Sequence, residues 1–150
     1  MKTDLFGLIT AGTGGVFRCH QPLPDSALET AARHSLLVVP IRLAVVRDKN
    51  AFLNALAAAL EFPAYFGHNW DAFYDCLLEL RHGGGAGTLL VLREVSAFAR
   101  AEPDEFAVAM DTLADAADYW RDAGKALLTI AELETPVLAP GLAPLSCPAK

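Results

Sequence analysis

The 150-residue chain has few cysteines, few basic side chains and no long apolar run. Its three cysteines, Cys19, Cys76 and Cys147, form no CxxC pair and are odd in number, so reduced thiols are expected rather than a disulfide framework. No stretch approaches the ~18–20 apolar residues of a membrane span. The first residues are not expected to act as a secretory leader, because Asp4 interrupts the cationic region. We therefore expect a cytoplasmic protein without a membrane partner.

Basic residues are outnumbered, with 12 Lys+Arg against 18 Asp+Glu, a net charge of −6. An acidic protein repels phosphate backbones, so direct nucleic-acid binding is disfavoured and a basic protein or a cation is the expected partner. The four histidines, at positions 20, 34, 68 and 82, include no pair at ligand spacing, so neither a metal nor another cofactor is expected. The hydrophobic fraction of 53% excludes a wholly disordered chain.

The chain divides into three regions: an amino-terminal extension at 1–35, a central domain at 36–134 and a proline-rich tail at 135–150. In the extension, 1–14 is expected to be a loop, followed by a strand at 15–19 and a helix at 25–34. The tail, with four prolines, is expected to be extended and loosely attached.

The central domain alternates strands and helices. Apolar runs at 36–43, 88–92 and 126–130 predict strands buried on both faces, which is typical of a parallel sheet. Pro40 removes a ladder donor, which places the first of these strands at an edge or at a bulge. Helices are predicted after Asp48, at 69–80 and at 103–122, and a flexible glycine-rich connector at 83–87. The pattern indicates an α/β fold.

The predicted helix at 69–80 has an unusual polar face. At ~100° per residue, one side carries the core-facing set Trp70, Phe73, Cys76, Leu77 and Leu80. The other side carries Asp71, Tyr74, Asp75 and Leu78. Carboxylates four residues apart destabilise a helix, and although Asp71 can complement the helix dipole, Asp75 lies a turn further in. An aromatic side chain ringed by acids is typical of a surface that binds a basic protein.

The helix at 103–122 also concentrates acidic residues. Its inner stripe is Phe106, Met110, Leu113, Ala117 and Trp120, and another face holds Asp111, Asp115, Asp118 and Asp122. For any single aspartate, a solvated helix face explains the residue as well as a functional role does. The concentration as a whole favours association with a cationic partner, since like charges raise the rate of such association.

Residues 62–77, Phe-Pro-Ala-Tyr-Phe-Gly-His-Asn-Trp-Asp-Ala-Phe-Tyr-Asp-Cys-Leu, resemble the barstar family of ribonuclease inhibitors. The order of elements from residue 36 to about residue 133 is also similar to that family, whereas 1–35 and the tail fall outside it. The resemblance implies a small α/β domain with a three-stranded parallel sheet packed with helices. It also implies an intracellular immunity protein that blocks the active site of a secreted, guanyl-specific ribonuclease.

The resemblance assigns partner-binding roles to individual positions. Tyr65, Asp71 and Asp75 match enzyme-contacting residues of the family, and Tyr74 stands where a tryptophan is typical. Gly67 and Asn69 match the loop that approaches the enzyme, whereas His68 replaces an acid often found there. A further acidic contact from the third helix has no single counterpart, because the alignment drifts between Asp118, Tyr119 and Asp122; Asp118 and Asp122 are the acidic candidates.

The expected mechanism is phosphate mimicry. Asp75 would occupy the site in which a ribonuclease holds phosphate between cationic side chains, forming short charge-assisted hydrogen bonds. Asp71 would support it, and the tyrosines at 65 and 74 would exclude water.

Two alternatives use the same residues. In an enzyme, His68 and Cys76 with Asp71 or Asp75 could form a nucleophile, base and orienting group. Cys76 lies on the apolar stripe, where an inert buried thiol is the commoner case, so we expect no enzymatic activity. Alternatively, the same fold could bind another basic protein or a toxin nuclease rather than a ribonuclease. The oligomeric state and the role of 1–35, which could lengthen the sheet or make a contact between copies, are left open by the sequence.

Overall fold

The computed structural model describes residues 3–63 and 67–146, which form a six-stranded sheet in the order β1-β6-β2-β5-β4-β3. Every neighbouring pair is parallel. The strands are β1 (Thr3–Asp4), β2 (Gly15–Cys19), β3 (Leu36–Arg42), β4 (Gly87–Arg93), β5 (Ala126–Glu132) and β6 (Ala143–Ser146). The α/β class and the parallel sheet are thus confirmed, and the three expected strands, β3, β4 and β5, are neighbours at one end of a longer sheet.

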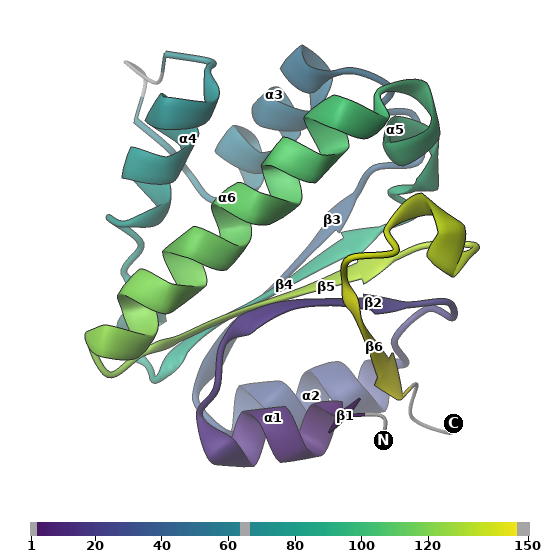
Figure 1. Ribbon diagram of the computed structural model, residues 1–150. Coiled ribbons are helices and arrows are strands. Elements are labelled where there is room, and N and C mark those ends of the chain that lie inside the picture. Colours follow the sequence, from purple (N-terminus) through teal and green to yellow (C-terminus); the bar gives the residue numbers. More distant parts are fainter. Residues whose placement is uncertain (1–2, 64–66, 147–150) are drawn as a thin grey trace.

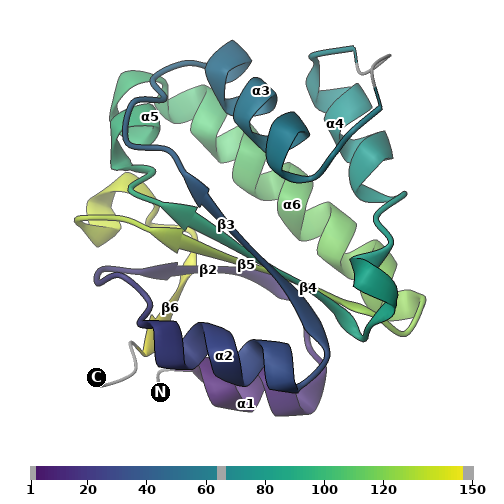
Figure 2. The same cartoon turned by 180° about the vertical axis from the view of Figure 1, so that it is seen from behind.

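Helices cover both faces of this sheet (Figure 1). One face is covered by α3 (Lys49–Ala59), α4 (Trp70–Leu77), α5 (Ser96–Ala101) and α6 (Pro103–Asp122). Figure 2 shows α1 (Leu5–Ala11) and α2 (Asp25–Arg33) together on the opposite face. Two 3-10 turns, η1 (His82–Gly84) and η2 (Pro136–Leu138), lie between elements. None of the helices in 3–63 and 67–146 is long and apolar enough to cross a membrane.

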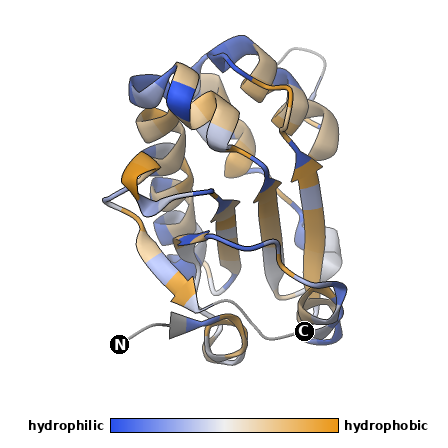
Figure 3. Cartoon of the chain, turned by 90° about the vertical axis from the view of Figure 1, so that its right-hand side faces the viewer, coloured by the Kyte–Doolittle hydropathy of each residue, from blue (hydrophilic) through white to orange (hydrophobic). Residues whose placement is uncertain are grey.

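The central strands are buried because their side chains are apolar on both faces. Every residue of β5 is buried, and so is every residue of β4 except Arg93. Figure 3 shows these strands coloured hydrophobic along most of their length and hydrophilic at their carboxyl ends. The strand β3 pairs with β4 alone, which confirms the edge position predicted from Pro40.

The two terminal segments differ from expectation. Residues 5–11 form a helix rather than a loop. Asp4 caps this helix, since its Oδ1 accepts a hydrogen bond from the backbone N–H of Gly7 at 2.6 Å. The helix also buries Leu5, Leu8 and Ile9 against the sheet. The described part of the tail, 135–146, is not loosely attached. Residues 143–146 form β6, which lies between β1 and β2, and Leu145 is only 3% exposed.

Three local expectations are also corrected. The glycine-rich connector is partly regular: it begins in the turn η1 and ends in the first residue of β4, Gly87, where a Cβ would overlap the carbonyl oxygen of Ala126 on the neighbouring strand. The helix predicted to reach residue 80 ends at Leu77. Of the cysteines, Cys76 is free and buried, but Cys19 is disulfide-bonded, which the odd number of cysteines did not indicate.

The packing of the tail makes Leu145 a test of the fold. Leu145→Ala is expected to lower the free energy of unfolding by ~2–5 kcal/mol, because it removes a buried side chain and leaves a cavity. Val137→Ala in the same tail is a matched control, since Val137 is 79% exposed and its truncation should cost less than ~0.5 kcal/mol. Urea denaturation measures both changes, and equal values for the two variants would contradict a buried β6.

Candidate protein-binding site

The turn that leads into α4 is held by side-chain hydrogen bonds. Asn69 caps the helix: its Oδ1 accepts the backbone N–H of Ala72 at 2.8 Å, and its Nδ2 donates to the carbonyl oxygen of Gly67 at 3.1 Å. His68 adopts a left-handed backbone conformation (φ 48°), and its Nε2 lies 2.6 Å from Oδ1 of Asn54 on α3. This turn is therefore tied both to the first turn of α4 and to the neighbouring helix.

The other end of α4 is attached to α6. The indole N–H of Trp120 donates to the carbonyl oxygen of Leu77, with 2.9 Å between the heavy atoms. This contact satisfies one of the carbonyl groups that a helix leaves without a partner in its last turn. Between the two ends, Phe73 is fully buried and Cys76 nearly so, as the predicted apolar stripe requires. The backbone of α4 is thus fixed at both ends and along one side.

The two carboxylates of α4 face solvent. Asp71 and Asp75 are both exposed, and neither forms an ion pair with any residue in the described part of the chain. No Lys or Arg occurs between Lys49 and Arg81, the segment that contains α4. Asp71 and Asp75 therefore present two charges that no lysine or arginine of the same segment neutralises.

Tyr74 differs from the sequence-based expectation. It is half-buried and packs against the main core, as does Leu78, so neither side chain stands fully in solvent beside the acids. Because α4 packs against α6 and also contacts Phe52 of α3, residues on its flanks meet neighbouring helices that a wheel drawn for an isolated helix does not include. Part of Tyr74 is still accessible next to Asp75.

The remaining predicted residues are placed as follows. Gly67 and Asn69 are exposed in the turn before α4, and Tyr65 lies outside the described residues. On α6, Asp118 and Asp122 are both exposed, but Asp118 is paired with Arg121 at 2.9 Å within the same helix. Such an exposed pair contributes little stability, but it partly neutralises Asp118.

Sequence reasoning missed three side chains that support α4. The side chain of Asn54 forms a hydrogen bond with the ring of His68. The Nζ atom of Lys49 lies over the ring of Trp70, 5.8 Å from its centroid. His82, the third, is buried in η1 and stands edge-on to Trp120 with ring centroids 4.4 Å apart. These contacts join residues 14 to 38 positions apart, so helical periodicity could not indicate them.

The chemistry of this surface is that of binding. Burial, together with the nearby charges of Glu79 and Asp75, raises the pKa of the Cys76 thiol, which disfavours the thiolate that a nucleophile needs. In 3–63 and 67–146, no group of three His, Cys, Asp or Glu side chains could hold a metal ion. What remains is a pair of exposed carboxylates on a fixed helix, an arrangement suited to charge-assisted hydrogen bonds with a cationic surface.

The fold and this surface define a class: a small α/β protein with an exposed acidic helix. The family model described as barstar (barnase inhibitor) matches residues 36–132, which is more than half of the chain. The protein belongs to the barstar family. Members of that family are inhibitors rather than enzymes, in agreement with the expectation that this chain has no catalytic activity.

Two further comparisons add little. No curated protein matches the chain. Among solved structures, Cdc6p from Pyrobaculum aerophilum is similar over 92% of this chain, with 16% sequence identity and a TM-score of 0.44. The chain spans 38% of the length of that structure.

The environment of His82 predicts that acid destabilises the fold. His82 Nδ1 lies 2.7 Å from Thr88 Oγ1, and within the described residues its buried Nε2 has no hydrogen-bond partner. Burial, and then the charge of Lys125, lower the pKa of His82 from 6.5. The unfolded chain therefore binds more protons than the folded one below about pH 6.5, and stability falls as the pH drops from there through the lower pKa of the folded state.

Urea denaturation between pH 7.5 and pH 5 measures this effect. His82→Gln should flatten the loss of stability over that range, whereas His34→Gln, at an exposed position on the opposite face of the sheet, should leave it unchanged. The same pH dependence in the wild type and in His82→Gln would contradict the assignment, because this comparison cancels the opposite contribution of Glu132, whose pKa burial raises.

Proposed function

We propose that this protein inhibits a basic, guanyl-specific ribonuclease of the barnase type by placing the acidic face of α4 over the active site of the enzyme. The observation that carries the proposal is the state of Asp71 and Asp75. Both are exposed on a helix fixed at its two ends, and neither is paired with a cation in the described part of the chain. The family match over residues 36–132 supports the same class of partner.

The chemistry follows from the groups that hold phosphate in such an enzyme. Arg, Lys and His side chains that bind a phosphate also bind a carboxylate, and Arg can do so with two parallel hydrogen bonds. Asp75 takes the place of the phosphate, and Asp71, one helical turn before it, supports the contact. Because α4 is already fixed, little conformational entropy is lost on binding.

The other predicted residues surround this contact. Gly67 and Asn69 form the turn that approaches the enzyme, and Tyr74 and Tyr65 exclude water from the charged hydrogen bonds. On α6, Asp118 and Asp122 add to the negative potential that draws a cationic partner toward the surface. An inhibitor of a secreted nuclease protects the cell that makes the enzyme, so its place is the cytoplasm.

Asp75→Ala tests this proposal. The variant should bind a purified guanyl-specific ribonuclease more weakly by ~2–5 kcal/mol, because truncation leaves the cationic groups of the enzyme buried without a partner. Inhibition constants from a ribonuclease assay measure the loss. Glu29→Ala is the matched control: it removes one negative charge from an exposed position on α2, on the opposite face of the sheet, and should inhibit like the wild type.

Three outcomes would contradict the proposal. Inhibition by Asp75→Ala within threefold of the wild type would show that α4 is not the contact surface. An association rate that does not fall with rising salt concentration would exclude electrostatic attraction as its basis. Wild-type protein that leaves the ribonuclease fully active, yet binds another cationic toxin nuclease, would assign the same surface to a different partner.

A further inference from the structure

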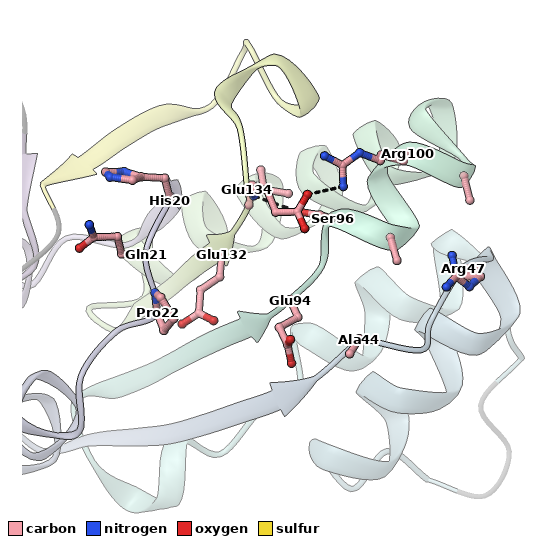
Figure 4. Close-up of a pocket in the computed structure, with 13 residues that line it drawn as sticks. His20, Gln21, Pro22, Ala44, Arg47, Glu94, Ser96, Arg100, Glu132 and Glu134 are labelled. Carbon is pink, nitrogen blue, oxygen red and sulfur yellow. Dashed lines mark hydrogen bonds and ion pairs between the residues drawn. The ribbon is translucent and has the colours of Figure 1, made fainter.

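The pocket at the carboxyl edge of the sheet has most of its charges paired within the chain. Glu132 forms an ion pair with Arg93. Glu134 forms another with Arg100, drawn as a dashed line in Figure 4. These two pairs connect β5 with β4 and α5. Because they cancel most of the charge, this region attracts a charged partner only weakly.

The outer face of α6 differs, because unpaired acids lie there on either side of an exposed aromatic ring. Asp115 is four residues before Tyr119 and Asp122 is three residues after it, so the three side chains share one side of the helix. Both aspartates are exposed, and neither forms an ion pair with any residue in 3–63 or 67–146. Among the Phe, Trp and Tyr side chains of those ranges, Tyr119 and Phe6 are the exposed ones, at 44% and 59%.

Tyr119 is held near the last turn of α4. Its ring packs edge-on against the ring of Trp120, with the centroids 5.2 Å apart and the planes at 89°. The indole N–H of Trp120 in turn donates to the carbonyl oxygen of Leu77, with 2.9 Å between the heavy atoms. Two successive contacts therefore connect the exposed ring to the helix that carries Asp75.

An aromatic ring in this position is suited to a protein interface. Tyrosine is enriched among the residues that contribute most to binding, because its ring buries a large area while only two torsions become fixed. The contact with Trp120 already restricts the ring, so less conformational entropy is lost on binding. Asp115 and Asp122 add the negative potential that attracts a cationic protein.

We propose that Tyr119 is a further contact residue for the nuclease, and that its ring packs on an apolar surface next to the cationic site of that enzyme. The inference rests on the function proposed for α4 and extends the contact surface onto α6. It adds an apolar contribution at the border of a charged contact. The partner is therefore a basic nuclease whose cationic site has an apolar border.

The apolar nature of this contact gives it a kinetic signature. Burial of a ring mainly slows dissociation, whereas exposed charges mainly raise the association rate. With a purified guanyl-specific ribonuclease, Tyr119→Ala should raise the dissociation rate constant at least tenfold and change the association rate constant less than twofold. Tyr119→Phe keeps the ring and should dissociate within threefold of the wild type. Surface plasmon resonance measures both rate constants.

Two variants are controls. Phe6→Ala also removes an exposed ring that packs edge-on against another, that of His34, but α1 lies on the opposite face of the sheet, so both rate constants should equal those of the wild type. Asp115→Asn should lower the association rate constant at low salt and leave dissociation within twofold of the wild type. Amide hydrogen exchange in α4 of free Tyr119→Ala should match the wild type, because Trp120 and its hydrogen bond to Leu77 remain.

Three results would overturn the assignment. Dissociation of Tyr119→Ala within threefold of the wild type would show that the nuclease does not cover the ring. A loss confined to the association rate constant would make the effect electrostatic. Faster hydrogen exchange in α4 would show that the substitution acts by loosening that helix. If Asp75→Ala inhibits poorly while Tyr119→Ala behaves like the wild type, only this inference fails; if both variants behave like the wild type, the function proposed for α4 fails as well.

Discussion

The contact between α4 and α6 is the constraint on which the acidic surface depends. Asp71 and Asp75 repel each other, and the acids of α6 add to the same field, so electrostatics alone would push these helices apart and fray their ends. The opposing contributions come from buried apolar side chains, Phe73 and Leu77 on α4 and Leu113 on α6, and from the hydrogen bond of Trp120 to the last turn of α4. Burial of each such side chain contributes ~1.5–3 kcal/mol, several times the few tenths lost to one like-charge pair. The charges can therefore be concentrated without loss of the fold.

The amino-terminal segment and the tail contribute strands to the sheet and are part of its structure. The side chains of Leu89, Val91, Leu128 and Ile130 point to the face opposite α4, where they pack in one cluster with residues of α1 and α2. The region matched by the family, 36–132, includes these strands but not the helices that cover them. Without 1–35, four large apolar side chains of the central strands would face water. The extension thus lengthens the sheet through β2 and buries its second face, one of the two roles that the sequence left open.

The elements that the sequence predicted well are those with strong local signals. The helix from Pro103 to Asp122 has a proline at its first position and a regular apolar stripe. The continuous apolar runs of β4 and β5 predict strands that are buried on both faces. The segments that it missed depend on distant partners. The tail strand forms because β1 and β2, more than 120 residues earlier, offer backbone partners on both of its sides. In the candidate site the exposure of Asp71 and Asp75 followed from helical period, but the half-burial of Tyr74 arises from the packing of neighbouring helices, which no single-helix pattern contains.

The distribution of the arginines distinguishes the acidic helix α4 from the carboxyl edge of the sheet. Arg93 and Arg100 pair with glutamates at the carboxyl edge of the sheet, and Arg121 pairs with Asp118 at the end of α6. The segment from residue 50 to residue 80 contains no lysine or arginine at all. A cationic partner at α4 therefore displaces no internal ion pair and loses none of its attraction to competition from this segment. At the carboxyl edge the opposite holds: internal pairing cancels most of the charge, so long-range attraction is weak there. Attraction of a cationic protein is in this way concentrated on the surface around α4.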